Sequence, residues 1–201
     1  MTAKEMKIKT FSLIEEYVPS ETSLVDDEDI NYKINGAINS VMFELARIKK
    51  IPAKYTVKVT KKNNSILIKD ITDIFQLNII PDIQYEMIGD YELVFHLDDD
   101  VEEQVVNIYY YKYPEKMELE FTAEGSLTAD EVSAEYDESF EFELDDSVLE
   151  IMPYGIAADL LKQDMISGYG KYFYERYMEL KQSLDTRVTN GAFIIDGGCE
   201  V

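Results

Sequence analysis

The chain has 201 residues, enough for one large domain or two small ones with a substantial core. Its 41 Asp and Glu outnumber its 19 Lys and Arg, and the net charge of -22 argues against nonspecific nucleic-acid binding and docking on anionic membranes, which both neutralise negative charge. The hydrophobic share of 46% and the 15 Tyr and 9 Phe argue against wholesale disorder.

Two helices are expected in residues 1–52. Thr2 and Glu5 have the spacing of a capping box, and a helical apolar stripe follows until Pro19, comprising Ile8, Phe11, Ile14 and Val18. A longer helix is predicted for 26–50, with acidic residues at its start and basic residues at its end, as the helix dipole favours. Its apolar face comprises Ile30, Ile34, Ile38, Val41, Leu45 and Ile48.

Residues 53–144 read as an inserted antiparallel β domain. Apolar and polar residues alternate in 54–60, and the turn at 62–65 predicts a hairpin with the strand that contains Ile66 and Ile68. Further strands are predicted at 73–80, 84–87, 91–97, 104–113, 118–122 and 139–144, separated by Pro, Gly and Asp turns. Short strands at this spacing favour a small sandwich or barrel.

Residues 145–187 predict a pair of helices. The first has an apolar stripe through Val148, Met152, Ile156 and Leu160, with Asp145 or Asp146 as its cap and Pro153 as a kink or restart point. Ser167 and Gly168 separate it from the second. The apolar stripe of the second helix comprises Tyr169, Phe173, Tyr177, Leu180 and Leu184.

The predicted fold class is therefore α+β: a helical bundle of two N-terminal and two C-terminal helices with an inserted antiparallel β domain. Residues 188–201 form an extended tail that contains one apolar run, at 192–195, between glycines. A lone strand of this kind needs a partner, either on a sheet edge of its own chain or on another chain.

Tyrosines are concentrated on one predicted strand and on the last predicted helix, where they occupy more than one face. An element that is aromatic on several sides predicts contacts on several sides, and aromatic residues are favoured interface anchors, although core packing is the simpler alternative. The candidate subunit or partner interface comprises Tyr109, Tyr111, Tyr169, Tyr172, Tyr177, Phe193, Ile194 and Ile195.

Nearly half of the acidic residues lie within 98–150, where the basic residues are Lys112 and Lys116. This cluster predicts either a negative wall that DNA passes without adhering or simply a solvated face. The candidate acidic channel or surface comprises Asp98, Asp99, Asp100, Glu102 and Glu103. The acidic runs lack the alternating ligands and the glycine of an EF-hand, so no calcium or other metal site is predicted.

Chemistry-bearing motifs are missing from the sequence. It contains no GxSxG, P-loop, HExxH, CxxC or GxGxxG pattern, and His96 has no neighbouring histidine or cysteine, so we read it as structural. We expect no catalytic residues, no cofactor and no enzymatic activity, although a carboxylate pair among so many acids is not excluded. Cys199 is the single cysteine, and the N-terminus has no apolar export core, so we expect a soluble protein made in a reducing compartment.

Three segments together resemble the head-tail connector, or adaptor, proteins of tailed bacteriophages. They are ELARIKKIPAKY at 44–55, IYYYKYPEKM at 108–117 and LDDSVLEIMPYGIAADLLKQD at 144–164, which a tyrosine-rich helix follows. The resemblance covers most of residues 3–184. It implies a virion protein of the neck, made in the host cytoplasm, that forms a ring of commonly twelve copies. Such a ring binds the portal on one side and tail or stopper proteins on the other, and DNA passes through it without specific binding.

The residues leave two other functions open. The chain could be another phage tail-completion or capsid-associated protein, which direct binding to a portal would distinguish. It could also be a cellular acidic module that binds a basic protein, because its charge suits such a partner.

Overall fold

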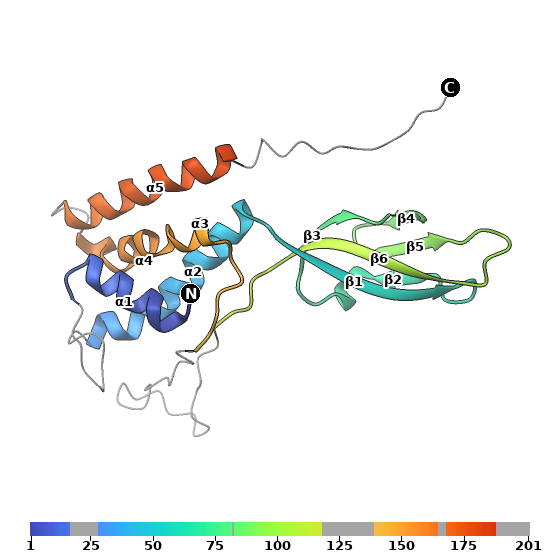
Figure 1. The fold of residues 1–201 in the computed structure, drawn as a ribbon, viewed down its shortest axis with the longest axis horizontal. Coiled ribbons are helices and arrows are strands. Elements are labelled where there is room, and N and C mark those ends of the chain that lie inside the picture. Colours follow the sequence, from blue (N-terminus) through green and yellow to red (C-terminus); the bar gives the residue numbers. More distant parts are fainter. Residues whose placement is uncertain (17–27, 82, 118–138, 165–167, 188–201) are drawn as a thin grey trace, which may run out of the picture. The chain divides into compact units, whose positions relative to one another are not determined.

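The structure, a computed structural model, describes residues 1–16, 28–81, 83–117, 139–164 and 168–187 (Figure 1). Helices and two small antiparallel sheets make the chain an α+β protein, as the sequence predicts. It divides into two compact units, one of Met1–Lys49 with Met117–Val201 and one of Lys50–Lys116. The expected β segment extended to residue 144, whereas the strand-containing unit ends at Lys116.

Helix α1 spans Ala3–Leu13 and begins as predicted, with a capping box. The backbone N–H of Glu5 donates to Thr2 Oγ1 at 3.2 Å, and the N–H of Thr2 donates to Glu5 Oε2 at 2.9 Å. The helix ends earlier than the apolar stripe suggested, because Glu15 has a φ of 62° and cannot continue a right-handed helix. Val18 lies outside the described residues.

Helix α2 spans Glu28–Ile48 and buries the predicted stripe over its central turns, at Ile34, Ile38, Val41 and Leu45. One turn of the helix also fixes the chain that follows the β unit. The Asn39 side chain donates to the carbonyl of Met117 at 3.0 Å and accepts from the Met117 N–H at 3.0 Å. These two bonds give the backbone of Met117 the partners that a neighbouring strand would otherwise supply.

The C-terminal helices begin where their sequence signals predict. Helix α3 spans Asp146–Leu149 and is capped by Asp145, whose Oδ1 accepts from the Ser147 N–H at 2.9 Å. Pro153 lies in the first turn of helix α4, Met152–Leu160, and so restarts the helix there. The short 3₁₀ helix η2, Lys162–Asp164, follows, and Gly168, with a φ of 92°, precedes helix α5, Tyr169–Arg187.

Helix α4 is the centre of the helical unit and packs against α1, α2 and α5. It is buried on almost every side because its sequence, MPYGIAADL, lacks a long charged face. The core around it includes Met6, Phe11, Ile34, Ile38, Met42, Leu45, Met152, Ile156 and Phe173.

The β unit consists of two three-stranded antiparallel sheets. The first has the order β1–β6–β3, with β1 at Ile51–Thr60, β6 at Glu103–Lys112 and β3 at Ile74–Ile79. The second has the order β2–β5–β4, with β2 at Ser65–Leu67, β5 at Glu92–His96 and β4 at Gln84–Ile88. The strands predicted at 73–80, 84–87, 91–97 and 104–113 are confirmed within a residue or so of their bounds.

The predicted hairpin between β1 and β2 is wrong. The chain does turn there, with a bridge between Thr60 and Asn63, but β1 pairs along its whole length with β6, whereas β2 pairs with β5. Ile68, expected in the second strand, lies in the 3₁₀ helix η1, Ile68–Asp70. The ten-residue register between β1 and β6 offers far more backbone pairing than a three-residue β2 could, so the long-range pair is favoured.

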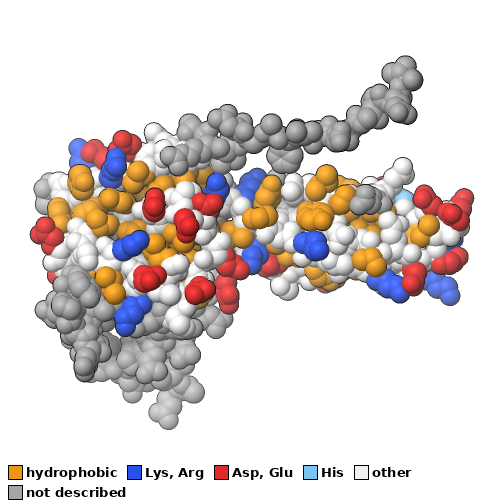
Figure 2. Space-filling model, in the orientation of Figure 1, with side chains coloured by type: hydrophobic (Ala, Val, Ile, Leu, Met, Phe, Trp, Pro, Cys, Tyr) orange, Lys and Arg blue, Asp and Glu red, His pale blue; other side chains and the backbone are white. Residues whose placement is uncertain are grey.

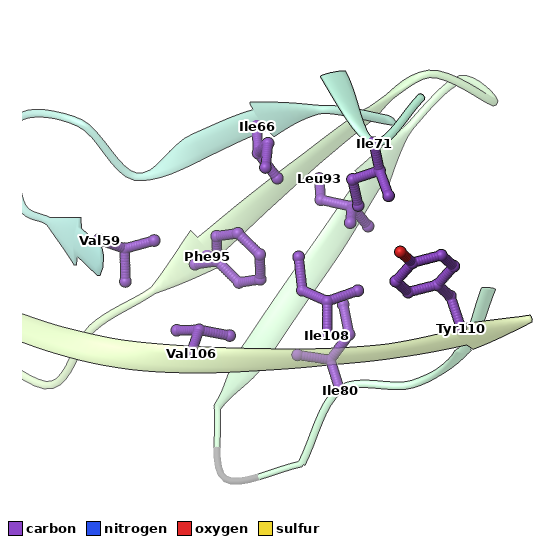
Figure 3. Close-up of a cluster of buried hydrophobic side chains, with 9 residues drawn as sticks. All are labelled: Val59, Ile66, Ile71, Ile80, Leu93, Phe95, Val106, Ile108 and Tyr110. Carbon is purple, nitrogen blue, oxygen red and sulfur yellow. The ribbon is translucent and has the colours of Figure 1, made fainter. Parts of the chain in front are cut away.

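One apolar cluster joins the two sheets (Figure 3). Leu93 and Phe95 of β5 point toward Val106 and Ile108 of β6, and each sheet contributes its inward-facing residues at every second position. The members of this cluster are Val59, Ile66, Ile71, Ile80, Leu93, Phe95, Val106, Ile108 and Tyr110. It is the core of the β unit.

Two further strand predictions fall after the β unit. The segment 118–122 lies outside the described residues. The strand expected at 139–144 is not formed. The segment makes only an isolated bridge, between Glu141 and Thr2, next to the start of α1. Phe142 and Leu144 are instead buried in the core of the helical unit.

Candidate interaction surfaces

Helix α5 has exposed tyrosines on the sides that do not face the core. Tyr169, Tyr172 and Tyr174 are all exposed, and Tyr172 shows 57% of its surface to solvent. The ring of Phe173, also on α5, is buried in the core and makes edge-on contacts with two of these tyrosines. The ring centroids lie 5.3 Å apart for Tyr169 and 5.2 Å apart for Tyr172. Tyr169 and Tyr172 are therefore held in place by a buried ring as well as by the helix. The three exposed tyrosines of α5 are here called the α5 tyrosine patch.

Tyr169 belongs to the predicted apolar stripe of α5 and is also a candidate interface residue, and its ring is exposed. The buried residues of the helix include Phe173, Tyr177 and Leu184, whereas Tyr169 lies beyond the edge of the core. Partial burial raises the pKa of its phenol, and the negative charges of Glu15 and Glu16 raise it further. The neutral phenol is therefore the stable form at physiological pH.

Tyr177 was predicted as an interface residue, but its ring is buried within the chain, with 5% of its surface exposed. It packs against Gly155 of α4, where an added Cβ would lie 2.8 Å from Tyr177 Cε2 and 2.9 Å from Val41 Cγ1. Only a glycine allows α2, α4 and α5 to approach this closely at that point. The ring of Tyr177 therefore belongs to the core of its own chain.

The hydroxyl of Tyr177 contacts a carboxylate on α2. It donates to Glu44 Oε2 at 2.8 Å, and Lys181, one turn further along α5, donates to Glu44 Oε1. Burial alone would raise the pKa of Glu44, but the hydrogen bonds from Lys181 and Tyr177 and the positive charge of Arg47 bring it below its ordinary value. Burial and the carboxylate both raise the pKa of Tyr177 far above its usual range. The group is a structural clamp between α2 and α5.

Strand β6 has tyrosines on both faces, as predicted. Tyr110 points into the cluster between the sheets and donates to Asp73 Oδ1 at 2.8 Å, and burial together with this carboxylate raises its pKa to about 12. Tyr109 and Tyr111 lie on the outer face, where Tyr109 is exposed and Tyr111 is half-buried, with Lys50 Nζ 5.0 Å from its ring centroid. The exposed Ile79 of β3 pairs with Tyr109 in the sheet register.

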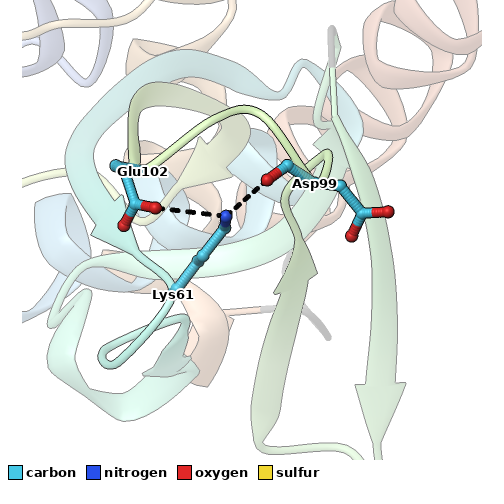
Figure 4. Close-up of polar contacts among 3 residues, drawn as sticks. All are labelled: Lys61, Asp99 and Glu102. Carbon is cyan, nitrogen blue, oxygen red and sulfur yellow. Dashed lines mark hydrogen bonds and ion pairs between the residues drawn. The ribbon is translucent and has the colours of Figure 1, made fainter.

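The candidate acidic residues lie in the loop between β5 and β6 and at the start of β6 (Figure 4). Asp98, Asp99, Asp100, Glu102 and Glu103 are all exposed. Two lysines, one in β1 and one in the turn after it, contact this acidic segment. Lys61 Nζ donates to the carbonyl of Asp99 at 2.6 Å and to Glu102 Oε1 at 3.3 Å. Lys58 Nζ lies 2.7 Å from Glu103 Oε2. The loop is thus an acidic surface that two lysines partly neutralise.

Within the described residues, no group of three or more His, Cys, Asp or Glu side chains is arranged to hold a metal ion. His96, at the end of β5, is exposed, and its Nε2 lies 4.0 Å from Glu86 Oε2. A membrane-crossing helix needs about 20 mostly apolar residues, and none of the helices in the described ranges meets that requirement. The predicted interface residues Phe193, Ile194 and Ile195 lie outside the described part of the chain.

Sequence reasoning missed one surface, the β4 strand. All five of its residues are exposed, and they include the large apolar side chains of Tyr85, Met87 and Ile88. Figure 2 shows that hydrophobic side chains reach the surface on both units on the face in view. The sequence predicted a strand at 84–87, and nothing local to that segment indicates that the strand lies at a sheet edge.

Comparison with known proteins gives no family for this chain. No protein-family model matches it, and no curated protein matches its sequence. The surfaces described above are therefore the basis for a functional conclusion.

Proposed function

We propose that this chain is a non-enzymatic structural protein of a tailed bacteriophage, a head-tail connector that forms a ring in the virion neck. The α5 tyrosine patch is the observation that supports this proposal most. Tyr169, Tyr172 and Tyr174 are exposed on a helix whose other side is fixed in the core, and tyrosines on a rigid element are favoured anchors between proteins. A neighbouring copy would remove these rings from water.

In this proposal the chain is a helical bundle with an inserted antiparallel β domain. The helices around α4 form the body of the ring, and the two-sheet unit Lys50–Lys116 is the insertion. Each copy meets a left and a right neighbour through different surfaces, because only head-to-tail contacts close into a cyclic ring. The portal binds one side of the ring, and tail or stopper proteins bind the other.

The proposed mechanism is geometric and electrostatic. Exposed acidic residues such as those of the β5–β6 loop repel DNA phosphates by about 1 kcal/mol per close pair in water, and salt screens this repulsion beyond about 8 Å. A channel with this charge would let DNA pass without holding it. Because each copy has a net charge of -22, the copies repel one another, so apolar and strand contacts must close the ring.

The experiment that tests this function is electron microscopy of the purified chain, alone and mixed with the portal protein of the same genome. The expected result is a closed ring seated on the portal, with or without rings of the chain alone. Changing Tyr172 and Tyr174 to Ser should abolish these rings, whereas Val105→Ser, at an equally exposed apolar residue on the outer face of β6, should leave them intact. Single copies in the presence of portal would overturn the proposal.

Two rival functions give different results in the same experiment. Another tail-completion or capsid-associated protein would be found in virions without binding the portal. A cellular acidic module would stay monomeric and bind a basic protein, which its charge of -22 favours.

A further inference from the structure

Strand β4 lies at an open edge of its sheet. In the order β2–β5–β4 it pairs with β5 on one side, and no strand of the described residues pairs with its other side. The backbone N–H and C=O groups along that side are therefore available to a further strand, as at any open sheet edge. Natural edges are usually blunted by charged residues, especially lysine, by proline or by a bulge. QYEMI contains neither lysine nor proline and pairs with β5 in continuous register, and its one charged residue, Glu86, lies on the face opposite to Tyr85 and Met87.

The register shows that the apolar layer between the two sheets reaches this edge. Tyr85 pairs with Phe95 and Met87 pairs with Leu93, and directly paired residues project on the same face of a sheet. Leu93 and Phe95 are fully buried in the cluster of Figure 3, yet Tyr85 and Met87 beside them are 40% and 42% exposed. One more strand along β4 would cover both side chains and continue the core.

We propose that this edge receives residues 192–195 of a neighbouring copy as an additional strand. The proposal rests on the proposed ring, because a head-to-tail contact requires a donor and an acceptor that are different parts of one chain. The described residues end at Arg187, and the sequence that follows contains one apolar run, AFII, between glycines.

The alternation of the donor segment matches that of the acceptor. In an extended strand Phe193 and Ile195 project on one face, two residues apart, as Tyr85 and Met87 do on β4. Addition of the segment with this face inward would place four apolar side chains over the open end of the core. Backbone hydrogen bonds would provide affinity, and the apolar pairs would fix the register.

A cross-linking experiment between two versions of the full chain tests this inference. Both carry Cys199→Ser; one also carries Met87→Cys, the other Ile195→Cys, and only the second is tagged. After co-assembly, a short bismaleimide reagent should join the two versions into a product of twice the chain mass. As the matched control, Val105→Cys replaces Met87→Cys, because Val105 is exposed on the outer face of the central strand β6. The control should give no such product.

Several results would overturn the inference while leaving the ring proposal intact. The first is a ring seen by microscopy that gives no cross-link. The second is a cross-link between two Met87→Cys chains, which would indicate that β4 pairs with itself. The third uses an additional version that carries both Met87→Cys and Ile195→Cys: cross-links found only within that chain would mean that β4 receives the segment of its own chain. Failure of both ring formation and cross-linking would overturn both proposals. Hydrogen exchange gives an independent measurement: β4 amides should exchange at least about tenfold more slowly in assembled wild type than in Phe193→Asp/Ile195→Asp, and equal rates would contradict the added strand.

Discussion

The hydroxyl of Tyr177 on α5 donates a hydrogen bond to Glu44 on α2 at 2.8 Å, across 133 positions of the sequence. The contact joins an N-terminal helix to the last helix, so it stabilises the arrangement that holds the α5 tyrosine patch in place. It also shows that a residue expected at an interface has an internal role. The predictions that follow begin with this pair.

Removing the Tyr177 hydroxyl while keeping the aromatic side chain should destabilise the fold. Tyr177→Phe removes one hydrogen-bond donor from Glu44, whose side chain is 45% exposed, and we expect a loss of about 0.5–1.5 kcal/mol in the free energy of unfolding, measured by urea titration. Tyr177→Ala should cost about 3–5 kcal/mol, because it also opens a cavity against Gly155. Tyr174→Phe, at an exposed position of the same helix, is the control and should change nothing. Equal stability of all three variants and wild type would refute the clamp.

Two glycines should respond in opposite directions to the same substitution. Gly155→Ala places a Cβ within 2.9 Å of Val41 and closer still to Tyr177, so overpacking should destabilise the chain by about 1–3 kcal/mol. Gly36→Ala, within α2, meets no atom within 4 Å and should stabilise the chain by about 0.5–1 kcal/mol through helix propensity. Thermal unfolding of both variants checks the pair. A stabilised Gly155→Ala would contradict the close approach of α4 to α5 at this residue.

Glu44 should make a recognisable contribution to acid unfolding. Because its folded pKa lies below the ordinary value of 4.5, its stabilisation is fully present above about that pH and is lost as the pH falls through the lowered folded pKa. Glu44→Gln lacks a titrating group there, so its stability relative to wild type should improve as the pH is lowered below 4.5. Urea unfolding at a series of pH values measures this difference. A constant difference between the two chains at all pH values would contradict it.

Two asparagines one turn apart on α2 should also differ. Asn39 pairs with both backbone groups of Met117, so Asn39→Leu should cost about 1–3 kcal/mol by leaving those groups unpaired. The buried side chain of Asn35 makes no hydrogen bond in the part of the chain that the structure describes. Asn35→Leu should therefore be neutral or stabilising. Urea unfolding measures the change in the free energy of unfolding of both variants. A loss of similar size in both would mean that Asn35 has a structural partner.

The sequence was sufficient where local signals determine the structure. The capping box of Thr2 and Glu5, the Asp145 cap and the helix start at Pro153 are each fixed by contacts within a few residues, and all three are confirmed. The positions of most strands of the β unit were predictable for the same reason, because alternation and turn residues are local patterns.

The sequence was insufficient where distant segments compete for one partner. Strand β1 pairs with β6, about 50 positions away, although the turn after β1 suggested a hairpin with β2. Tyr169 and Tyr177 share the periodicity of one helix face, yet Tyr169 is exposed and Tyr177 is buried, because the face extends beyond the helices that cover it. The partner of Tyr177, Glu44, was likewise missed, since nothing near either residue identifies the other.

Native mass measurement of the full chain, mixed with portal protein, tests the central claim most directly. The account predicts a complex in which the mass contributed by this chain is a ring-sized multiple of 23.2 kDa. That multiple should disappear in the Tyr172→Ser/Tyr174→Ser variant while the variant keeps wild-type unfolding behaviour. If wild type instead remains at 23.2 kDa in the presence of portal, or if the double variant assembles as well as wild type does, the α5 tyrosine patch is not a contact between copies.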